Sequence, residues 1–344
     1  ASADTVYGEA GDDYISMFNN DNANDYVDGG AGIDTLYVRQ NTTTTGTVID
    51  LTNGTMTSQA NVDTILGFEN VYTGFTNSVA EVIGSDQVNV ITAQSGSIGV
   101  KMAGMEGDDT LDGDDTSSGL ASTEDWASHE YETAGVTVNL PAGTAIDGWG
   151  GNDVLIGIEN IIGSAYGDTL TGDANGNTID AGDGNDFIYA KGANSADNDV
   201  IIGGDGTDTA YLLDVTSINT ITLDLTTGDY DIDTITPGSV IAADGNISEV
   251  EIIYTARGDD YITGSTGADT LFTSDGNDIL NLGTGDDFVN AGLGNDTIDG
   301  EGGEDTVDYS TDATAIIVDL QTDIDDVTVE QDSGGANGTD RLYN

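Results

Sequence analysis

The sequence of 344 residues contains no cysteine and one histidine, and each shortage removes a class of chemistry. Without cysteine the chain has neither a disulfide framework nor thiolate ligands. One histidine excludes zinc sites of the HExxH type, which need two. No apolar run approaches the roughly 18 residues that a membrane-spanning helix requires. Soft metals therefore lack their usual ligands here, and a bound ion has to be held by oxygen atoms.

Positive charge is also scarce. Five Lys+Arg oppose 64 Asp+Glu, which gives a formal net charge of −59. Nucleic acid and anionic membranes attract positive charge, so we expect no nucleic-acid partner and no direct membrane insertion. Hydrophobic residues still make up 37% of the chain, too many for a purely disordered acidic tail. A compact fold at this charge needs a cation built into it, because self-repulsion would otherwise destabilise it.

A nine-residue repeat runs from Thr255 to Asp308. In each copy an aspartate stands two residues after a glycine and two residues before an aliphatic residue. The aspartates are Asp260, Asp269, Asp278, Asp287, Asp296 and Asp305. The glycines are Gly258, Gly267, Gly276, Gly285, Gly294 and Gly303, and the aliphatic residues are Ile262, Leu271, Leu280, Val289, Ile298 and Val307. This is the nonapeptide G-G-x-G-x-D-x-U-x of calcium-binding parallel β-rolls, and this many copies in one phase are hard to obtain by chance.

The spacing predicts the fold. Each copy divides into a six-residue turn and a three-residue strand, so two copies make one coil of about 18 residues. We therefore predict an all-β chain, a right-handed parallel β-roll solenoid with interspersed irregular strand-rich segments. Residues i and i+18 then stack, which places on the two edges the sets Asp260, Asp278, Asp296 and Asp269, Asp287, Asp305. A carboxylate between successive turns, beside glycine carbonyls, can supply the hard oxygen ligands that calcium prefers. Glycine is expected because the turn needs φ > 0 and a close approach of the backbone to the metal.

Less perfect copies precede this run. Their aspartates in the same position of the repeat are Asp13, Asp25, Asp34, Asp109, Asp153, Asp168, Asp186, Asp199 and Asp208. Two further copies carry asparagine there, Asn89 and Asn177.

A longer period lies over the short one. The segments ending at Leu51, Leu140, Leu225 and Leu320 are alike, which predicts a tandem array of units of roughly 90 residues. The predicted divisions are a first nonapeptide run over 1–47, units over 48–135, 136–220 and 221–315, and the start of a truncated fourth unit over 316–344. Both ends look cut from a longer polypeptide, and no N-terminal signal peptide is visible.

These residues resemble the RTX (repeats-in-toxin) family of Gram-negative bacterial proteins, and the resemblance covers most of the chain. It implies multiple calcium ions on a β-roll, export by type I secretion through an uncleaved C-terminal signal, and folding outside the cell, where calcium is millimolar. It implies calcium-ligand roles for the six aspartates of the last run, for their glycines and for the nine earlier aspartates. The turns with Asn89 and Asn177 are expected to bind calcium weakly or not at all.

Some acidic residues have plainer explanations. In the doublets Asp12-Asp13, Asp108-Asp109, Asp259-Asp260 and Asp286-Asp287 we expect the first member to face solvent and the second the metal. For Glu69, Glu159 and Glu251, outside the nonapeptides, structural or surface roles are expected. An EF-hand is excluded, because no stretch has the required ligand spacing with glycine at the sixth place and glutamate at the twelfth. One helix is predicted, over Ser122–Glu132, where a serine cap precedes acidic residues.

The sequence has few residues of the types used in catalysis, and we expect that the chain is not an enzyme. His129, with Trp126 and Tyr131 close by in sequence, is expected to belong to a packing or surface cluster. Paired carboxylates for glycoside cleavage stay open, because 64 acids form many accidental pairs, yet nothing singles one pair out. The tyrosines recur where strands should lie, and packing or strand propensity is the default explanation, with a glycan-binding face as the alternative: Tyr14, Tyr26, Tyr37, Tyr189, Tyr211 and Tyr261.

The sequence thus predicts a calcium-binding extracellular structural protein, a segment of a surface layer (S-layer), adhesin or filament, secreted or at the cell surface. We expect it to fold on secretion into millimolar calcium and to assemble by self-association or by continuation into further repeats. A surface glycan or lipopolysaccharide is a further expected partner. The alternative is the C-terminal RTX folding and secretion module of an exported enzyme or toxin.

Overall fold

The structure is a computed structural model. It describes residues 3–19, 23–40, 46–58, 61–74, 79–93, 99–113, 124–190, 199–212, 220–233, 245–309, 318–320, 327–330 and 340–343. The chain divides into two compact bodies, Ala1–Asp168 and Thr169–Asn344, called here the N-terminal and C-terminal bodies. Apart from one 3-10 turn, η1 (Leu140–Ala142), the regular elements of the described residues are all strands, which confirms the all-β prediction.

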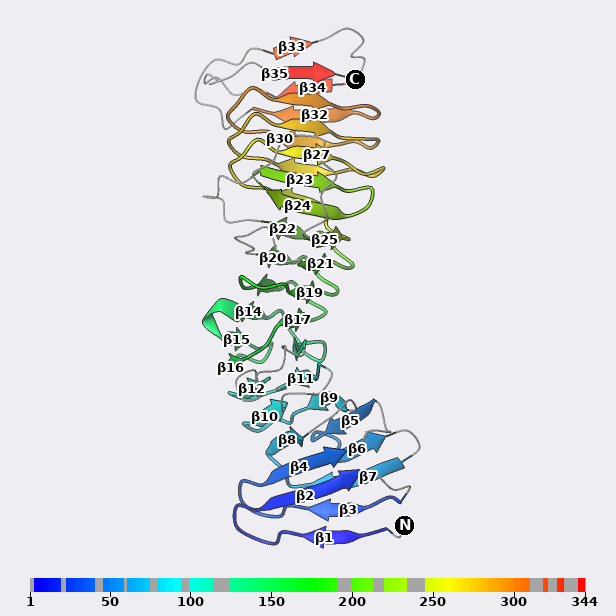
Figure 1. Cartoon of the computed structure of the whole chain (residues 1–344), viewed down its shortest axis with the longest axis vertical. Helices are drawn as coiled ribbons and strands as arrows, with labels where there is room; N and C mark the ends of the chain where they lie inside the picture. Colours follow the sequence, from blue (N-terminus) through cyan, green and yellow to red (C-terminus); the bar gives the residue numbers. More distant parts are fainter. Residues whose placement is uncertain are drawn as a thin grey trace. The chain divides into compact units, whose positions relative to one another are not determined.

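The strands of the N-terminal body form two sheets (Figure 1). The first sheet contains β1 (Thr5–Tyr7), β3 (Tyr26–Asp28), β5 (Thr47–Asp50), β6 (Thr55–Ser58), β7 (Asn61–Leu66), β9 (Val79–Ile83), β11 (Lys101–Ala103), β13 (Trp126–Ser128) and β17 (Asn160–Ile162). The second contains β2 (Tyr14–Asn19), β4 (Thr35–Gln40), β8 (Asn70–Gly74), β10 (Val90–Ala93), β12 (Thr110–Asp112), β14 (Thr137–Asn139), β15 (Thr144–Ile146) and β16 (Asn152–Ile156).

The C-terminal body has the same two-sheet arrangement. Its first sheet contains β19 (Thr178–Asp180), β21 (Val200–Ile202), β23 (Thr220–Asp224), β24 (Asp229–Asp233), β25 (Gly245–Ser248), β27 (Tyr261–Thr263), β29 (Ile279–Asn281), β31 (Thr297–Asp299), β33 (Val318–Leu320) and β35 (Asp340–Tyr343). Its second sheet contains β18 (Thr169–Thr171), β20 (Phe187–Tyr189), β22 (Thr209–Tyr211), β26 (Ile252–Tyr254), β28 (Thr270–Phe272), β30 (Phe288–Asn290), β32 (Asp305–Asp308) and β34 (Val327–Glu330).

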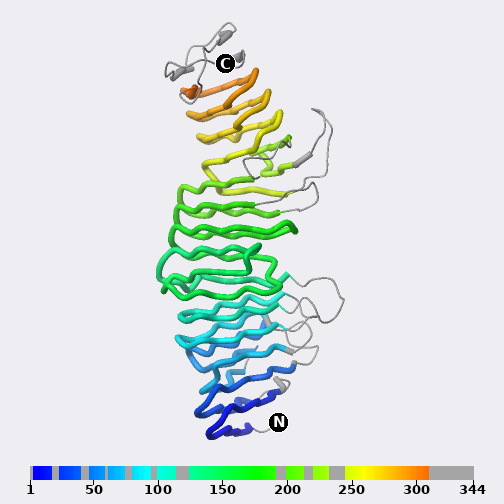
Figure 2. Tube along the Cα trace, turned by 90° about the vertical axis from the view of Figure 1, so that its left-hand side faces the viewer, coloured from blue at the N-terminus to red at the C-terminus, as the bar shows by residue number. Residues whose placement is uncertain are grey.

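The chain alternates between the two sheets, so successive strands on one sheet pair in parallel. In the last run Tyr261 of β27 is opposite Ile279 of β29, which is opposite Thr297 of β31, each 18 residues apart. On the other sheet Thr270 of β28 is opposite Phe288 of β30. Figure 2 shows these coils as stacked turns, drawn in yellow and orange. The predicted coil of two nonapeptides is therefore confirmed, and with it the parallel β-roll.

The aliphatic residues of the repeat form a narrow core between the two sheets. Ile262, Leu271, Leu280, Val289, Ile298 and Val307 are at most 3% exposed. They alternate along each short strand with side chains that point outward, as period-2 strand geometry requires. Each coil buries one such residue per strand, so the core is thin and its area is small for the length of the chain. Other interactions have to hold the turns.

Antiparallel excursions interrupt the parallel coils at three places in the described chain. They are the triplets β5–β6–β7, β14–β15–β16 and β23–β24–β25, in which the middle strand pairs antiparallel with both neighbours. Their first turns contain Gly54, Gly143 and Gly228, with φ of 64°, 65° and 78°, in the left-handed region that favours glycine. The triplets begin at the recurring segments that the sequence singled out. The division into 90-residue units stays a prediction.

The helix predicted over Ser122–Glu132 is wrong where the structure describes it. Ser122 lies outside the described residues, and Trp126–Ser128 forms strand β13, followed by a turn. Strand β13 pairs in parallel with β11 on one side and β17 on the other. Pairing with two neighbouring strands therefore overrides the local helical signal.

Aromatic side chains form stacks along the outer face of the second sheet. In the C-terminal body Tyr189, Tyr211, Tyr254 and Phe272 follow one another with ring centroids 4.6, 4.6 and 4.4 Å apart and nearly parallel planes. Both faces of the Tyr211 ring are covered, by Tyr189 and Tyr254. This arrangement fits the packing explanation of the tyrosines, because ring faces that contact each other are not available to a sugar. No helix within the described residues is long and apolar enough to cross a membrane.

Candidate calcium sites

The predicted ligand aspartates all stand at the ends of turns, immediately before a strand or at its first residues. Twelve of the fifteen are buried, with at most 3% exposure: Asp34, Asp109, Asp153, Asp168, Asp186, Asp199, Asp208, Asp260, Asp278, Asp287, Asp296 and Asp305. The other three, Asp13, Asp25 and Asp269, are half-buried. Aspartate is almost never buried in this way unless its charge is paired. Burial of so many carboxylates in a chain with five basic residues therefore calls for a partner.

The carboxylates form ladders along the turns. The N–H of Asp260 donates to Oδ1 of Asp278, and the N–H of Asp278 donates to Oδ1 of Asp296, at 2.8 and 2.9 Å. On the opposite edge, the N–H of Asp287 donates to Oδ1 of Asp305 at 3.1 Å. The same bond joins Asp13 to Asp34, Asn177 to Asp199, and Asp186 to Asp208. The structure thus confirms the predicted stacking on two edges and shows how one carboxylate oxygen is held.

The second oxygen of several ladder carboxylates has a different environment from the first. Oδ2 of Asp13, Asp34, Asp109, Asp208 and Asp287 is buried and has no hydrogen-bond partner among the described residues. Such an atom costs free energy unless a cation faces it. A Cβ on the first glycine of the repeat would lie 2.7 Å from Oδ2 at Gly8 and 2.8 Å from it at Gly203, so a side chain there would occupy the space in front of the oxygen. Oxygen donors of this kind fit calcium.

The glycine at the fourth position of the repeat, predicted as a ligand, is required by a close approach in four of the six turns of the last run. A Cβ on Gly276 would collide with the carbonyl of Gly258, and one on Gly294 with the carbonyl of Gly276. The corresponding carbonyls of Gly267 and Gly285 face Gly285 and Gly303. Carbonyl oxygens therefore line the same edge as the carboxylates. Among the described residues no three acidic or imidazole side chains converge on one point, so a cation here depends on these main-chain oxygens.

Burial of the ladder carboxylates raises the pKa of several of these aspartates. Burial raises the pKa of Asp278 to about 9, that of Asp109 to about 8 and that of Asp260 to about 7. Neighbouring carboxylates add to the effect at Asp278, where Asp260 and Asp296 are close. Without a cation these groups hold a proton well above the usual range of aspartate, and a divalent ion can replace that proton.

Several members of the ladder lie outside the predicted set. The N–H of Asp34 donates to Oε2 of Glu69 at 2.7 Å, and Asp125 and Asp208 donate in the same way to Glu159 and Glu251. Glutamate thus takes the place of the repeat aspartate, which is a structural role more specific than the one expected. The signal was present in the sequence, because Val71, Ile161 and Ile253 stand two residues after these glutamates.

Aspartates outside good nonapeptides were also missed. The N–H of Asp25 donates to Oδ1 of Asp63, and the N–H of Val100 donates to Oδ1 of Asp125. Oδ1 of Asp147 accepts from Trp149 N and Gly151 N, at 2.8 and 2.7 Å. The antiparallel triplets bring Asp63 and Asp147 to the turns, and no local spacing marks them.

The acid doublets separate by exposure, and the first members face solvent as predicted. Asp12, Asp108, Asp259 and Asp286 are exposed, whereas Asp109, Asp260 and Asp287 are buried and Asp13 is half-buried. The exposed members also make hydrogen bonds between turns. Oδ1 of Asp259 accepts from the N–H of Asn277, 18 residues later, at 2.7 Å. They form an outer ladder beside the buried one.

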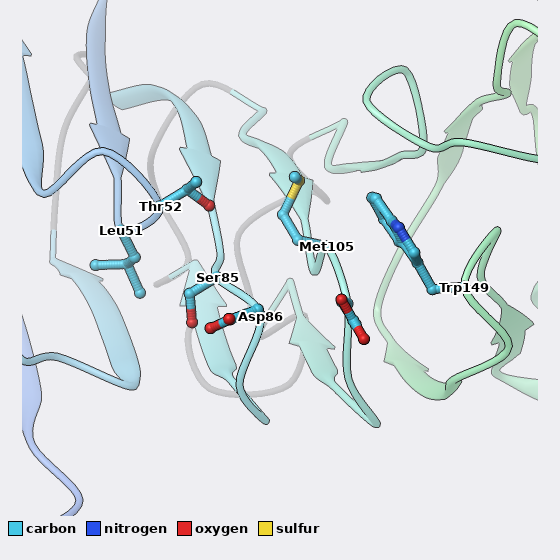
Figure 3. Close-up of a pocket in the computed structure, with 7 residues that line it drawn as sticks. Leu51, Thr52, Ser85, Asp86, Met105 and Trp149 are labelled. Atoms are coloured by element: carbon cyan, nitrogen blue, oxygen red, sulfur yellow. The ribbon is translucent and has the colours of Figure 1, made fainter.

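Acids at the third position of the turn lie on the outer side. A pocket of 290 Å³ in the N-terminal body is lined by Leu51, Thr52, Ser85, Asp86, Met105, Glu106 and Trp149 (Figure 3). Asp86 and Glu106 are exposed there, whereas Asn89 and Asp109 of the same two turns are at most 1% exposed. The third-position carboxylates are therefore separate from the ladder.

The single histidine lies in a buried cluster. Nδ1 of His129 is 3.3 Å from Oε1 of Glu132, and Oε2 of Glu132 accepts from Gly148 N at 3.0 Å. Tyr131 points elsewhere and donates to Glu81 at 2.9 Å. This geometry agrees with the expected packing role of His129.

These features define a class of protein, a parallel β-roll whose stacked turns present carboxylate and carbonyl oxygens to a hard cation. The chain matches the profile of the RTX calcium-binding nonapeptide repeat over residues 1–16, 21–37, 101–116, 162–194, 195–212, 254–289 and 282–313. It therefore contains RTX repeats in several copies, and these repeats bind calcium. The repeats at 84–92 and 148–156 lie outside the matched segments. No curated protein is similar enough to the chain to count as a match.

Proposed function

We propose that this protein is an extracellular structural segment, of a surface layer, adhesin or filament, that folds and assembles when it meets millimolar calcium. RTX repeats are typical of calcium-binding proteins of the secreted type, and we place this chain outside the cell on that basis. The observation that carries the proposal is the continuity of the ladder. Buried aspartates joined from turn to turn run through the described parts of both bodies, so most of the chain is devoted to binding calcium and stacking coils.

Charge supports a coupling of folding to assembly. At a net charge of −59, copies of the chain repel one another until bound calcium neutralises the turns. Part of the second sheet of the C-terminal body has no charged residue in its described strands. Strands β18, β20, β22, β26, β28 and β30 contain no charged residue and present threonine, tyrosine and phenylalanine outward. A second copy meets least repulsion on this face, and we propose it as the place of lateral contact.

The test is the assembly state of the purified chain in 10 mM calcium, followed by light scattering and electron microscopy, with 10 mM magnesium as the control for ionic strength. We expect end-to-end or lateral assemblies in calcium and their dissolution in EGTA. A strictly monodisperse, folded monomer at high concentration in calcium would refute self-assembly.

The second candidate is the folding and secretion module of an exported enzyme or toxin. The same calcium-dependent folding serves that role, because it keeps the chain extended until export is complete. A catalytic domain encoded next to this segment favours the module, and further repeats favour the structural protein. In both cases we propose that the segment itself is not catalytic. A surface glycan or lipopolysaccharide remains a proposed partner of the structural protein.

A further inference from the structure

Thirteen of the nonapeptide turns fall into two conformations, which the second residue of the repeat distinguishes. In nine turns this residue is left-handed, with φ between 56° and 106°: Glu9, Gly30, Met105, Gly182, Gly204, Ser274, Gly283, Gly292 and Glu301. Four of the nine are not glycine, and in these four the left-handed conformation is strained, so the rest of the fold has to offset that strain. We call these the left-handed turns.

In four other turns the N–H of the second residue points at the side chain of the sixth. Ser164 N donates to Oδ2 of Asp168 at 2.6 Å, and Ser265 N donates to Oδ2 of Asp269 at 2.7 Å. The serine hydroxyls add bonds of 2.8 and 2.9 Å to the other carboxylate oxygen. Both oxygens of each carboxylate are then satisfied from within the same turn. We call these the closed turns.

The other two closed turns are those with asparagine. Ser85 N donates to Oδ1 of Asn89 at 2.6 Å, and Asp173 N donates to Oδ1 of Asn177 at 2.7 Å. The amide of Asn89 donates in turn to the carbonyl of Glu69 at 2.7 Å. An amide group here contacts the carbonyl oxygen that would otherwise be offered to a cation. The turns in which a carboxylate is lost thus share their conformation with those of Asp168 and Asp269.

The carboxylate oxygens without a hydrogen-bond partner also distinguish the two kinds of turn. Oδ2 of Asp13, Asp34, Asp109, Asp208 and Asp287 is buried without a partner among the described residues, and each of these aspartates belongs to a left-handed turn. A main-chain N–H is a fixed donor that carries partial positive charge and cannot turn a lone pair toward a metal. It therefore competes with a cation for the carboxylate. A hydroxyl, such as that of Thr273 beside Asp278, can rotate to offer its oxygen instead.

We propose that the conformation of the second residue decides which nonapeptide turns bind calcium, and that Asp168 and Asp269 are not calcium ligands although they match the motif. Left-handed turns bind the ion, and closed turns are complete without it. The determinant in this chain is the pair at positions one and two. Gly-Ser closes the turn at Gly84-Ser85, Gly163-Ser164 and Gly264-Ser265, whereas Thr273-Ser274 is left-handed. The array then alternates calcium-dependent coils with turns that form in its absence.

The test compares two aspartates on the same edge of one run. Asp269 donates its N–H to Oδ1 of Asp287 at 2.8 Å, so the two are neighbours in the ladder, one in a closed turn and one in a left-handed turn. Asparagine suits both positions. At 287 its Oδ1 can still accept from Asp269 N, and at 269 it can accept the closing N–H as Asn89 does from Ser85. The number of calcium ions per chain is measured at saturation by equilibrium dialysis with elemental analysis, on variants shown by circular dichroism to be folded.

We expect Asp287→Asn to lose at least one ion and Asp269→Asn to keep the wild-type number. Asp168→Asn is the second instance of a closed turn and is also expected to keep it. Ser265→Gly removes the hydroxyl and allows the left-handed conformation, and should gain one ion. Loss of an ion in Asp269→Asn or Asp168→Asn, or an unchanged number in Ser265→Gly, would overturn the proposal. The proposal on turn conformation rests on the proposed function, in which the chain folds with calcium. A wild-type chain that binds no calcium would refute the proposed function, whereas the variants test the turn conformation alone.

Discussion

The N–H of Asp260 donates to Oδ1 of Asp278, 18 residues further along the chain, at 2.8 Å. This bond joins two consecutive coils on one edge of the roll through a side chain rather than through the sheet. Repeated from turn to turn, it leaves one oxygen of each carboxylate for another partner. The ladder therefore fixes the turns at the spacing of the strands and leaves their charge to be neutralised by calcium.

Removal of calcium should unfold the chain. A site at ten times its Kd contributes about 1.4 kcal/mol, so a dozen sites contribute on the order of 15 kcal/mol, comparable to the whole stability of an ordinary domain. Circular dichroism in EGTA should show the β signal replaced by that of coil. Persistence of the full signal at nanomolar calcium would contradict the calcium dependence.

The two positions Asp278 and Asp199 should differ in a calcium titration. Asp278→Ala removes the acceptor of Asp260 N and a carboxylate that has ladder neighbours on both sides, at a cost of about 1 to 3 kcal/mol for the unpaired N–H alone. Asp199 accepts from Asn177, which belongs to a closed turn. We expect the calcium midpoint of folding to shift further in Asp278→Ala. Equal shifts in the two variants would show that the ladder is not cooperative.

The pH dependence of folding should reverse when calcium is added. The pKa of Asp278 is raised to about 9 in the folded chain and is near 3.9 in an unfolded one. Between these values the folded chain holds more protons, so without calcium its stability falls as pH rises. With calcium the proton and the ion compete, and acid weakens binding. Circular dichroism in EGTA should show more β structure at pH 5 than at pH 8, and the opposite order of thermal midpoints is expected in calcium. The same trend in both buffers would count against protonation of the buried ladder.

Two glycines of the last run provide a matched pair. A Cβ on Gly276 would collide with the carbonyl of Gly258, whereas one on Gly267 meets Ser265 Oγ at 3.7 Å, an ordinary contact. Gly276→Ala should therefore destabilise the folded chain by about 2 kcal/mol, the cost of overpacking. Gly267→Ala should stay within about 0.5 kcal/mol of wild type. Chemical denaturation in saturating calcium measures the stability of both variants. A large loss of stability in Gly267→Ala would mean that glycine is needed at the fourth position for its conformational freedom and not for the close approach.

The sequence alone determined the coil, its two edges and most of the ladder, because a strict period of nine leaves one arrangement in which every aliphatic residue is buried. Ile262 and Leu280 lie inward and Asp260 and Asp278 stack for that single reason. Tertiary structure decided the features that the nine-residue period does not predict. Asp63 and Asp147 reach the turns by way of antiparallel triplets, and Trp126–Ser128 is a strand because it lies between two others.

The state of each turn was likewise settled in three dimensions. Asp269 and Asp287 occupy the same place in the motif, yet Asp269 accepts the N–H of Ser265, whereas Oδ2 of Asp287 is buried without a hydrogen-bond partner among the described residues. The direction of one main-chain N–H separates them. A motif records which residues are present at each position, whereas the direction of that N–H depends on the backbone conformation of the turn.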